Sequence, residues 1–146
     1  MIGRVRTGAM AGVIGGMVFG MMMAMMGMLP IIAGMVGSQS SVVGFAIHLM
    51  ISALIGGGFG AVFGSSATSS SRALAFGMGY GAAWWLIGPL TMMPLMMGMG
   101  LGSSWNGQAI ASALPSLVGH LIYGGITGYT YVRLGGASRR MAAHTS

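Results

Sequence analysis

Long apolar runs fill this sequence, and only short polar breaks separate them. Its 146 residues are 55% hydrophobic and 4% charged, and they include no aspartate or glutamate. A typical soluble domain carries about 25% charged residues. Because such a chain cannot build a water-facing surface, the composition predicts an all-α integral membrane protein.

The apolar runs are long enough to define transmembrane helices. A helix needs about 20 apolar residues to cross a hydrocarbon core of roughly 30 Å. Four runs reach this length, and they predict helices over residues 8–36, 42–64, 73–97 and 109–134. The first run is too long for the apolar part of a cleavable signal peptide, so we expect it to be retained. The sequence therefore predicts a single domain, residues 1–146, folded as a four-helix bundle in a membrane.

The charged residues predict the topology. All six are arginines, at Arg4, Arg6, Arg72, Arg133, Arg139 and Arg140. Cytoplasmic loops collect arginine, whereas exported loops do not. With four helices all six fall on one side, so we expect both termini to be cytoplasmic, in a plasma (inner) or energy-transducing membrane. Arginines that only flank membrane-length runs do not form the basic face that nucleic acid requires, so nucleic acid is not an expected partner.

The chain resembles a tandem duplication of a two-helix unit, residues 8–64 and 73–135. At an offset of 61, residues 17–20 (Met-Val-Phe-Gly) fall on residues 78–81 (Met-Gly-Tyr-Gly). At an offset of 72, His48 falls on His120 and Gly56 falls on Gly128. The difference between the offsets assigns an 11-residue insertion to the second outer loop, and the two units are expected to be related by a pseudo-two-fold axis along the membrane normal.

Small residues recur every four positions along the predicted helices. Such faces let helix backbones approach closely, which replaces the hydrophobic driving force that lipid abolishes. We expect them to pack helices within the bundle or against partner subunits. The candidate helix-packing residues are Gly8, Gly12, Gly16, Gly20, Ala24, Ser52, Gly56, Gly60, Ala73, Gly77, Gly81, Gly124 and Gly128.

Two histidines, His48 and His120, lie within the apolar runs, each continuing its helix's small-residue stripe. A polar imidazole at membrane depth is costly and marks a candidate functional site. One interpretation is that each ring only hydrogen-bonds a hydroxyl or carbonyl group on a neighbouring helix. Another is that both are axial ligands of haem or of a chlorophyll-type pigment, since imidazole binds haem iron well. A bare metal ion is the third.

Methionine is the other residue in excess, with 18 copies. Met21 and Met25, and likewise Met92 and Met96, lie one helical turn apart, and thioethers are soft ligands that favour Cu(I). This spacing resembles the helical motif of eukaryotic copper importers. Methionine is also a flexible residue that packs against irregular surfaces. Adaptable packing and a Cu(I) site therefore both remain open.

A family resemblance rests on helices two and four. The pattern of His120, Gly124, Gly128 and Tyr131, echoed by His48, Ser52, Gly56 and Phe59, resembles one found in small bacterial inner-membrane proteins of the YagU-like kind. The resemblance implies four helices with a recurring histidine, and it implies no activity.

The residue types that are missing argue against an enzyme. Asp, Glu, Lys and Cys, which supply most general bases and covalent nucleophiles, are all absent. We therefore expect an accessory or structural subunit whose partners are the lipid bilayer and other membrane subunits. The alternatives are a haem- or pigment-binding module that uses His48 and His120, and a Cu(I) or small-solute permease with methionine-rich faces.

Overall fold

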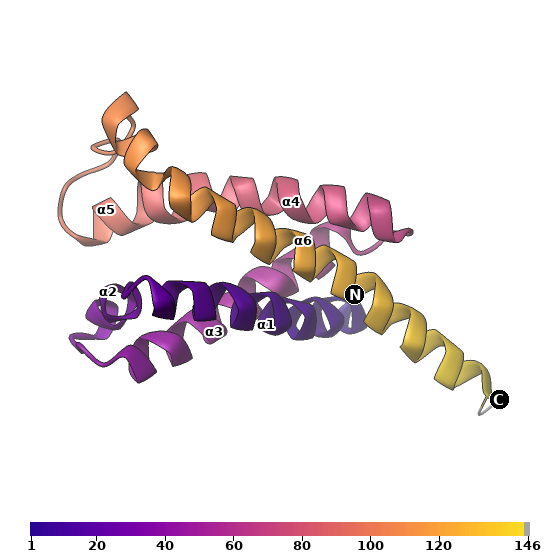
Figure 1. Ribbon diagram of the computed structural model, residues 1–146. Coiled ribbons are helices and arrows are strands. Elements are labelled where there is room, and N and C mark those ends of the chain that lie inside the picture. Colours follow the sequence, from indigo (N-terminus) through magenta and orange to yellow (C-terminus); the bar gives the residue numbers. More distant parts are fainter. Residues whose placement is uncertain (145–146) are drawn as a thin grey trace.

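The structure is a computed structural model that describes residues 1–144, with side-chain surroundings for residues 1–135. Within that part of the chain all regular structure is helical, as predicted (Figure 1). The elements are α1 (Ile2–Met25), α2 (Leu29–Ala33), the 3-10 turn η1 (Gly34–Val36), α3 (Ser41–Phe63), α4 (Ser70–Ile87), the π-helical segment η2 (Gly88–Met92), α5 (Met93–Met96) and α6 (Gly107–His144).

The first long helix differs from the predicted range of 8–36 at both ends. It begins at Ile2 and ends at Met25, because Gly27 adopts a left-handed conformation with φ of 67°. The Gly27 N–H donates to the Ala24 carbonyl and the Met28 N–H donates to the Met23 carbonyl. This pattern is a Schellman cap, in which a left-handed glycine satisfies the last carbonyls of a helix. Beyond this cap, Leu29–Ala33 form the separate short helix α2, with Pro30 in its first turn, and Gly34–Val36 form η1.

The second and third long helices are joined by a short connection with its own cap. α3 ends at Phe63, and α4 begins at Ser70 after the N-cap residue Ser69. The Ser69 hydroxyl accepts a hydrogen bond from the Arg72 backbone N–H at 3.3 Å, which satisfies one of the free donors at the start of α4. The Arg72 guanidinium donates to the Thr68 hydroxyl at 3.4 Å.

The helical path of α4 continues without a break through η2 and α5. Pro89 has no N–H to donate to the carbonyl one turn earlier, and a π-helical segment runs over Gly88–Met92. The Thr91 hydroxyl of this segment donates to the Leu86 carbonyl of α4 at 2.8 Å. The path ends at Met96, where Gly98 has φ of 77° and forms a second Schellman cap.

The last helix is longer than the predicted range of 109–134. α6 begins after Asn106, whose side-chain oxygen accepts the Ala109 N–H at 3.0 Å, and it runs to His144. The prediction ended the helix where the apolar run ends. Hydropathy sets how much of a helix lies in lipid, however, and the α-helical conformation itself continues into polar sequence.

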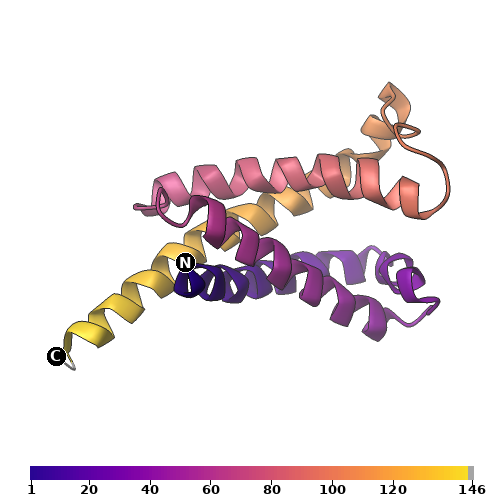
Figure 2. The same cartoon turned by 180° about the vertical axis from the view of Figure 1, so that it is seen from behind.

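The long helices form two pairs. α1 packs along α3, and α4 packs along α6, whereas α3 and α4 touch little. The pairs are joined by α1, which also packs on α6 (Figures 1 and 2). One core cluster, around Phe59 and Tyr131, lies toward the start of α1, and a second, around Phe19 and Tyr123, lies further along.

Among the described residues, three helices are long and apolar enough to cross a membrane: α1, α3 and residues Gly107–Gly135 of α6. The chain is therefore a helical protein of the membrane type.

The start of α1, the α3–α4 connection and the far part of α6 lie at one end of the molecule, and α2 and α5 lie at the other (Figure 1). All four arginines with described side chains, Arg4, Arg6, Arg72 and Arg133, belong to the first of these ends, which we call the arginine end.

Candidate functional site

The two histidines of the candidate membrane spans lie at the junction of the helix pairs. His48 comes from α3 and His120 comes from α6, and Phe19 of α1 lies against both. The centroid of the Phe19 ring is 5.4 Å from that of His48 and 4.9 Å from that of His120, with edge-to-face geometry in each case. The structure therefore brings the two predicted residues together, with an aromatic ring between them.

His48 ties α3 to α1. Its Nε2 lies 3.0 Å from the Gly16 carbonyl oxygen, which can only accept, so Nε2–H is the donor. The Ser52 hydroxyl lies 3.5 Å from the same nitrogen, one turn along α3. The ring is buried, with 7% of its surface exposed. In a neutral imidazole this arrangement places the proton on Nε2 and leaves the lone pair on Nδ1.

His120 is held by its own helix. Its Nδ1 donates to the Ser116 carbonyl oxygen at 2.7 Å, one turn earlier in α6. A neutral His120 therefore carries its lone pair on Nε2. Among the described residues no hydrogen bond engages this second nitrogen. Each imidazole thus keeps one nitrogen that can accept a proton or bind a metal.

Aromatic and hydroxyl groups that the sequence did not single out complete the site. The Tyr123 hydroxyl of α6 donates to the Ser52 carbonyl of α3 at 2.7 Å. The Trp85 indole of α4 donates to the Ala113 carbonyl at 3.0 Å and to the Ser116 hydroxyl at 3.1 Å. Thr127 is fully buried, and its hydroxyl has no hydrogen-bond partner among the described residues. Aromatic residues in an apolar run give no signal of their own, because most of them simply pack.

The space between the imidazoles is occupied by protein. Phe19 packs against Gly119, where a Cβ atom would collide with the ring. The aromatic ring therefore occupies the space that the missing side chain leaves on α6. A macrocycle held by both histidines would have to replace Phe19. As it stands, His48 hydrogen-bonds across a helix interface and His120 bonds within α6, and axial ligation by the two histidines stays a prediction.

The small-residue stripes are located inside the helix pairs. A Cβ atom on Gly12 would meet the Ser52 carbonyl of α3, and one on Gly56 would meet the Gly8 carbonyl of α1. In the other pair, a Cβ atom on Gly77 would meet the Gly124 carbonyl, and one on Gly128 would meet the Ala73 carbonyl. Backbone therefore lies directly on backbone in both pairs, the arrangement that small-residue faces permit.

The remaining candidates extend these two interfaces. Gly16 and Gly20 face Ser52 and His48, Gly60 faces the Arg4 carbonyl, and Gly81 faces the His120 carbonyl. Ala24 is exposed, so the stripe on α1 ends at Gly20.

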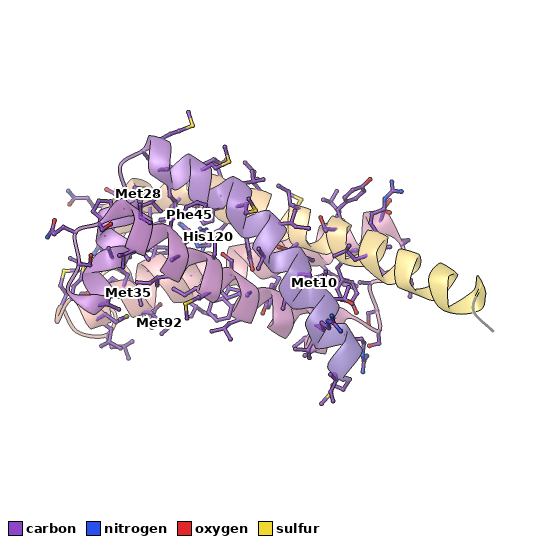
Figure 3. All side chains as sticks on the ribbon, turned by 90° about the horizontal axis from the view of Figure 1, so that it is seen from below. Met10, Met28, Met35, Phe45, Met92 and His120 are labelled. Carbon is purple, nitrogen blue, oxygen red and sulfur yellow. The ribbon has the colours of Figure 1, made fainter. Side chains whose placement is uncertain are left out.

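The candidate Cu(I) methionines lie on the surface. Met21 and Met25 of α1 are 61% and 88% exposed, and Met92 of η2 and Met96 of α5 are 49% and 56% exposed. Figure 3 shows Met28, Met35 and Met92 at the end of the molecule opposite the arginine end, with Met10 nearer the latter. Exposed thioethers can contact lipid, another protein or a soft metal ion, and the Cu(I) site stays a prediction.

Comparison with known proteins identifies no family for this chain. No family model matches the chain, and no curated protein or solved structure is significantly similar to it.

Proposed function

We propose that the protein is a non-catalytic accessory subunit that packs against other helices in a larger membrane complex. The observation that supports this proposal is that different residue types occupy the inside and the outside of the molecule. The glycines join the helices of the chain to one another, while methionine and aliphatic side chains cover the outside. Methionine adapts to irregular partner surfaces, so this outside suits contact with other helices.

The proposal includes four membrane crossings. The fourth is the continuous helical path from Ser70 to Met96, formed by α4, η2 and α5. At 1.5 Å per residue this path is about 40 Å long, which exceeds the hydrocarbon core of roughly 30 Å. α4 alone is only 18 residues long and includes Arg72, so a crossing depends on its continuation through the two proline-containing segments.

Both termini are proposed to be cytoplasmic, in a plasma (inner) or energy-transducing membrane. The clustering of arginines at one end of the molecule supports this orientation, because such residues accumulate on the cytoplasmic side. Labelling single cysteines introduced at Ser65 and at Ser103 tests it, since the natural chain has no cysteine. Reagent that does not cross the membrane should reach Ser103→Cys in intact cells and reach Ser65→Cys only after lysis.

The proposal also retains the tandem duplication, and the packing supports it. Gly12 faces Ser52 and Gly56, and in the same way Gly77 faces Gly124 and Gly128. On the second helix of each unit, the contacting residues are 72 positions apart, which equals the offset found in the sequence. On the first helix, Gly12 and Gly77 are 65 positions apart, whereas the sequence offset is 61. We infer that the first helices of the two units differ in register by about one helical turn.

Co-purification tests the accessory role. The tagged protein, extracted in mild detergent from its native host, is expected to carry the same partner polypeptides in constant stoichiometry. Replacing the exposed Leu54 and Met50 of α3 with alanine, and separately Met92 and Met96, should identify the face that holds the partner. A preparation that contains this chain alone, at native expression level, would refute the role.

A cofactor-binding module is the second candidate, and the unengaged nitrogens of His48 and His120 support it. The test is the visible absorption spectrum of the protein purified from its native host. A haem or pigment band that disappears in the His48→Ala, His120→Ala double variant would establish this function. The matched control is His144→Ala, and a colourless preparation in which all three histidines are present would reject it.

A further inference from the structure

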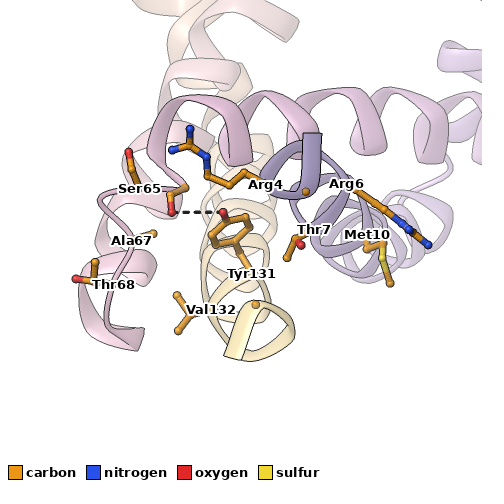
Figure 4. A pocket seen from close by; sticks show the side chains of 12 residues that line it. Arg4, Arg6, Thr7, Met10, Ser65, Ala67, Thr68, Tyr131 and Val132 are labelled. Carbon is orange, nitrogen blue, oxygen red and sulfur yellow. Dashed lines mark hydrogen bonds between the residues drawn. The ribbon is translucent and has the colours of Figure 1, made fainter. Parts of the chain in front are cut away.

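A basic pocket opens at the arginine end. It has a volume of about 810 Å³ and lies between the start of α1, the α3–α4 connection and α6 (Figure 4). Its polar lining comprises the side chains of Arg4, Arg6, Thr7, Ser65, Thr68 and Tyr131. Met10, Ala67 and Val132 supply an apolar part of the wall. The pocket thus combines cations, hydroxyl donors and apolar surface.

The cations of this pocket have no counter-ion among the side chains of the protein. The whole sequence contains no aspartate or glutamate, so no carboxylate side chain can neutralise Arg4 or Arg6. Arg72 adds a third positive charge nearby, because its guanidinium bonds the pocket-lining Thr68 hydroxyl. The charge of the pocket therefore favours an anionic ligand.

The wall of the pocket is held in place by packing. A Cβ atom on Gly64 would lie 3.0 Å from Arg4 Cδ and would collide with the Tyr131 hydroxyl. The stem of Arg4 consequently rests on Gly64, and the Tyr131 hydroxyl donates to the Gly64 carbonyl at 3.4 Å, the bond drawn in Figure 4. This contact fixes the start of α1 against α3 and α6.

We propose that this pocket binds the phosphate group of an anionic phospholipid. Arginine and hydroxyl groups are suited to phosphate oxygens, and basic pockets between helices on the cytoplasmic side recognise anionic lipid headgroups. The pocket lies at the end of the candidate spans, where headgroups are found, and its apolar wall suits the first carbons of the lipid tails. The inference rests on the proposed membrane orientation and is independent of the accessory role.

The test is native mass spectrometry of the intact protein in mild detergent. Phosphatidylglycerol, phosphatidylcholine and inorganic phosphate are each titrated. We expect phosphatidylglycerol to bind at least fivefold more tightly than phosphatidylcholine, and inorganic phosphate at equal concentration to leave the bound lipid in place. Equal binding of the two lipids would overturn the proposal. Binding of inorganic phosphate without any preference for phosphatidylglycerol would overturn the lipid assignment and identify a site for a free anion.

Variants then locate the site. An arginine in contact with an anionic headgroup changes lipid binding about fivefold, so Arg4→Gln with Arg6→Gln should weaken phosphatidylglycerol binding about twenty-fivefold. Arg133→Gln is the matched control, because Arg133 stacks on Tyr129 at 5.0 Å and does not line the pocket. It should stay within about twofold of the natural protein. An equal loss in the control would mean that net charge, and not this pocket, attracts the lipid. The thermal transition of every variant is compared with that of the natural protein, so that a folding defect is recognised.

Discussion

The α1–α3 pair and the α4–α6 pair have the same kind of interface between their own two helices. They differ in the residues that each presents to the other pair. In both pairs, small residues place backbone on backbone. Toward the other pair, α1 presents Gly15, where a Cβ atom would lie 2.7 Å from the Thr127 hydroxyl of α6. At the matching place α4 presents Tyr80, whose hydroxyl donates to the Ile55 carbonyl of α3 at 2.9 Å.

These two contacts are counterparts. Tyr80 follows Gly15 by 65 positions and Thr127 follows Ile55 by 72, the same separations that relate the inner interfaces. Glycine lets α1 lie close to α6, whereas the tyrosine ring keeps α4 away from α3. The comparison teaches that two helix pairs with the same internal packing can join asymmetrically, because one side-chain volume sets each distance of approach.

Breaking an inner interface is expected to have the largest effect. Gly56→Leu and Gly124→Leu each place a side chain where the backbone of the facing helix lies, and each should lower the free energy of unfolding by about 3 kcal/mol. The measurement is unfolding of the purified protein in detergent. Gly79→Leu is the control, because among the described residues no atom beyond the local backbone of α4 lies within 4 Å of a Cβ at that position. Near-normal stability of either core variant would show that its pair does not pack backbone on backbone.

Filling the close junction is expected to have the next largest effect. Gly15→Tyr gives α1 the residue type that α4 has, and it should cost about 2 kcal/mol and increase the distance between α1 and α6 by about 2 Å. Spin labels on cysteines at Met17 and Val118, both exposed, report that distance in a chain with no other cysteine. Ile14→Tyr, on the neighbouring exposed position, should leave it unchanged. An unchanged distance in Gly15→Tyr would remove side-chain volume as the cause of the asymmetry.

The two histidines provide a smaller contrast. His48 bonds across to α1 and His120 bonds within α6, so only His48→Leu removes a bond between helices. Such bonds in membranes contribute about 0.6 kcal/mol on average and up to about 1.7. We expect His48→Leu to cost about 1 kcal/mol more than His120→Leu in the same unfolding measurement. The reverse order would mean that His120 has a partner beyond its own helix.

The smallest effect is expected from the hydroxyl that joins α4 to α3. Tyr80→Phe keeps the ring and removes its bond to the Ile55 carbonyl, which should cost about 0.5 kcal/mol. Tyr129→Phe serves as the control, because its hydroxyl bonds the exposed Arg133. If Tyr80→Phe were as stable as this control, the ring alone would account for the spacing of the helices.

Hydropathy predicted the all-α class, and the small-residue spacing singled out glycines that lie between the paired helices, whereas Ala24 of the same set is exposed. They did not predict the end of α1 at Met25, because Gly27 and its Schellman cap interrupt a run that hydropathy reads as continuous. They also missed Phe19, Tyr123 and Trp85 around the histidines. Contacts of this kind depend on which helix faces which, and a periodic pattern on one helix contains no information about its neighbour.

The end of the molecule formed by α2, α5 and the connections beside them contains no charged residue. In the proposed orientation this end would have to pass through the lipid during biosynthesis, and a charged side chain at the centre of a membrane costs about 2.5–3.5 kcal/mol on the scale of translocon insertion. The connections from α1 to α3 and from α5 to α6 contain no charged residue, so neither incurs this cost. In that orientation each helix pair would enter the bilayer as a hairpin, and the arginines at its base would stop it from passing through.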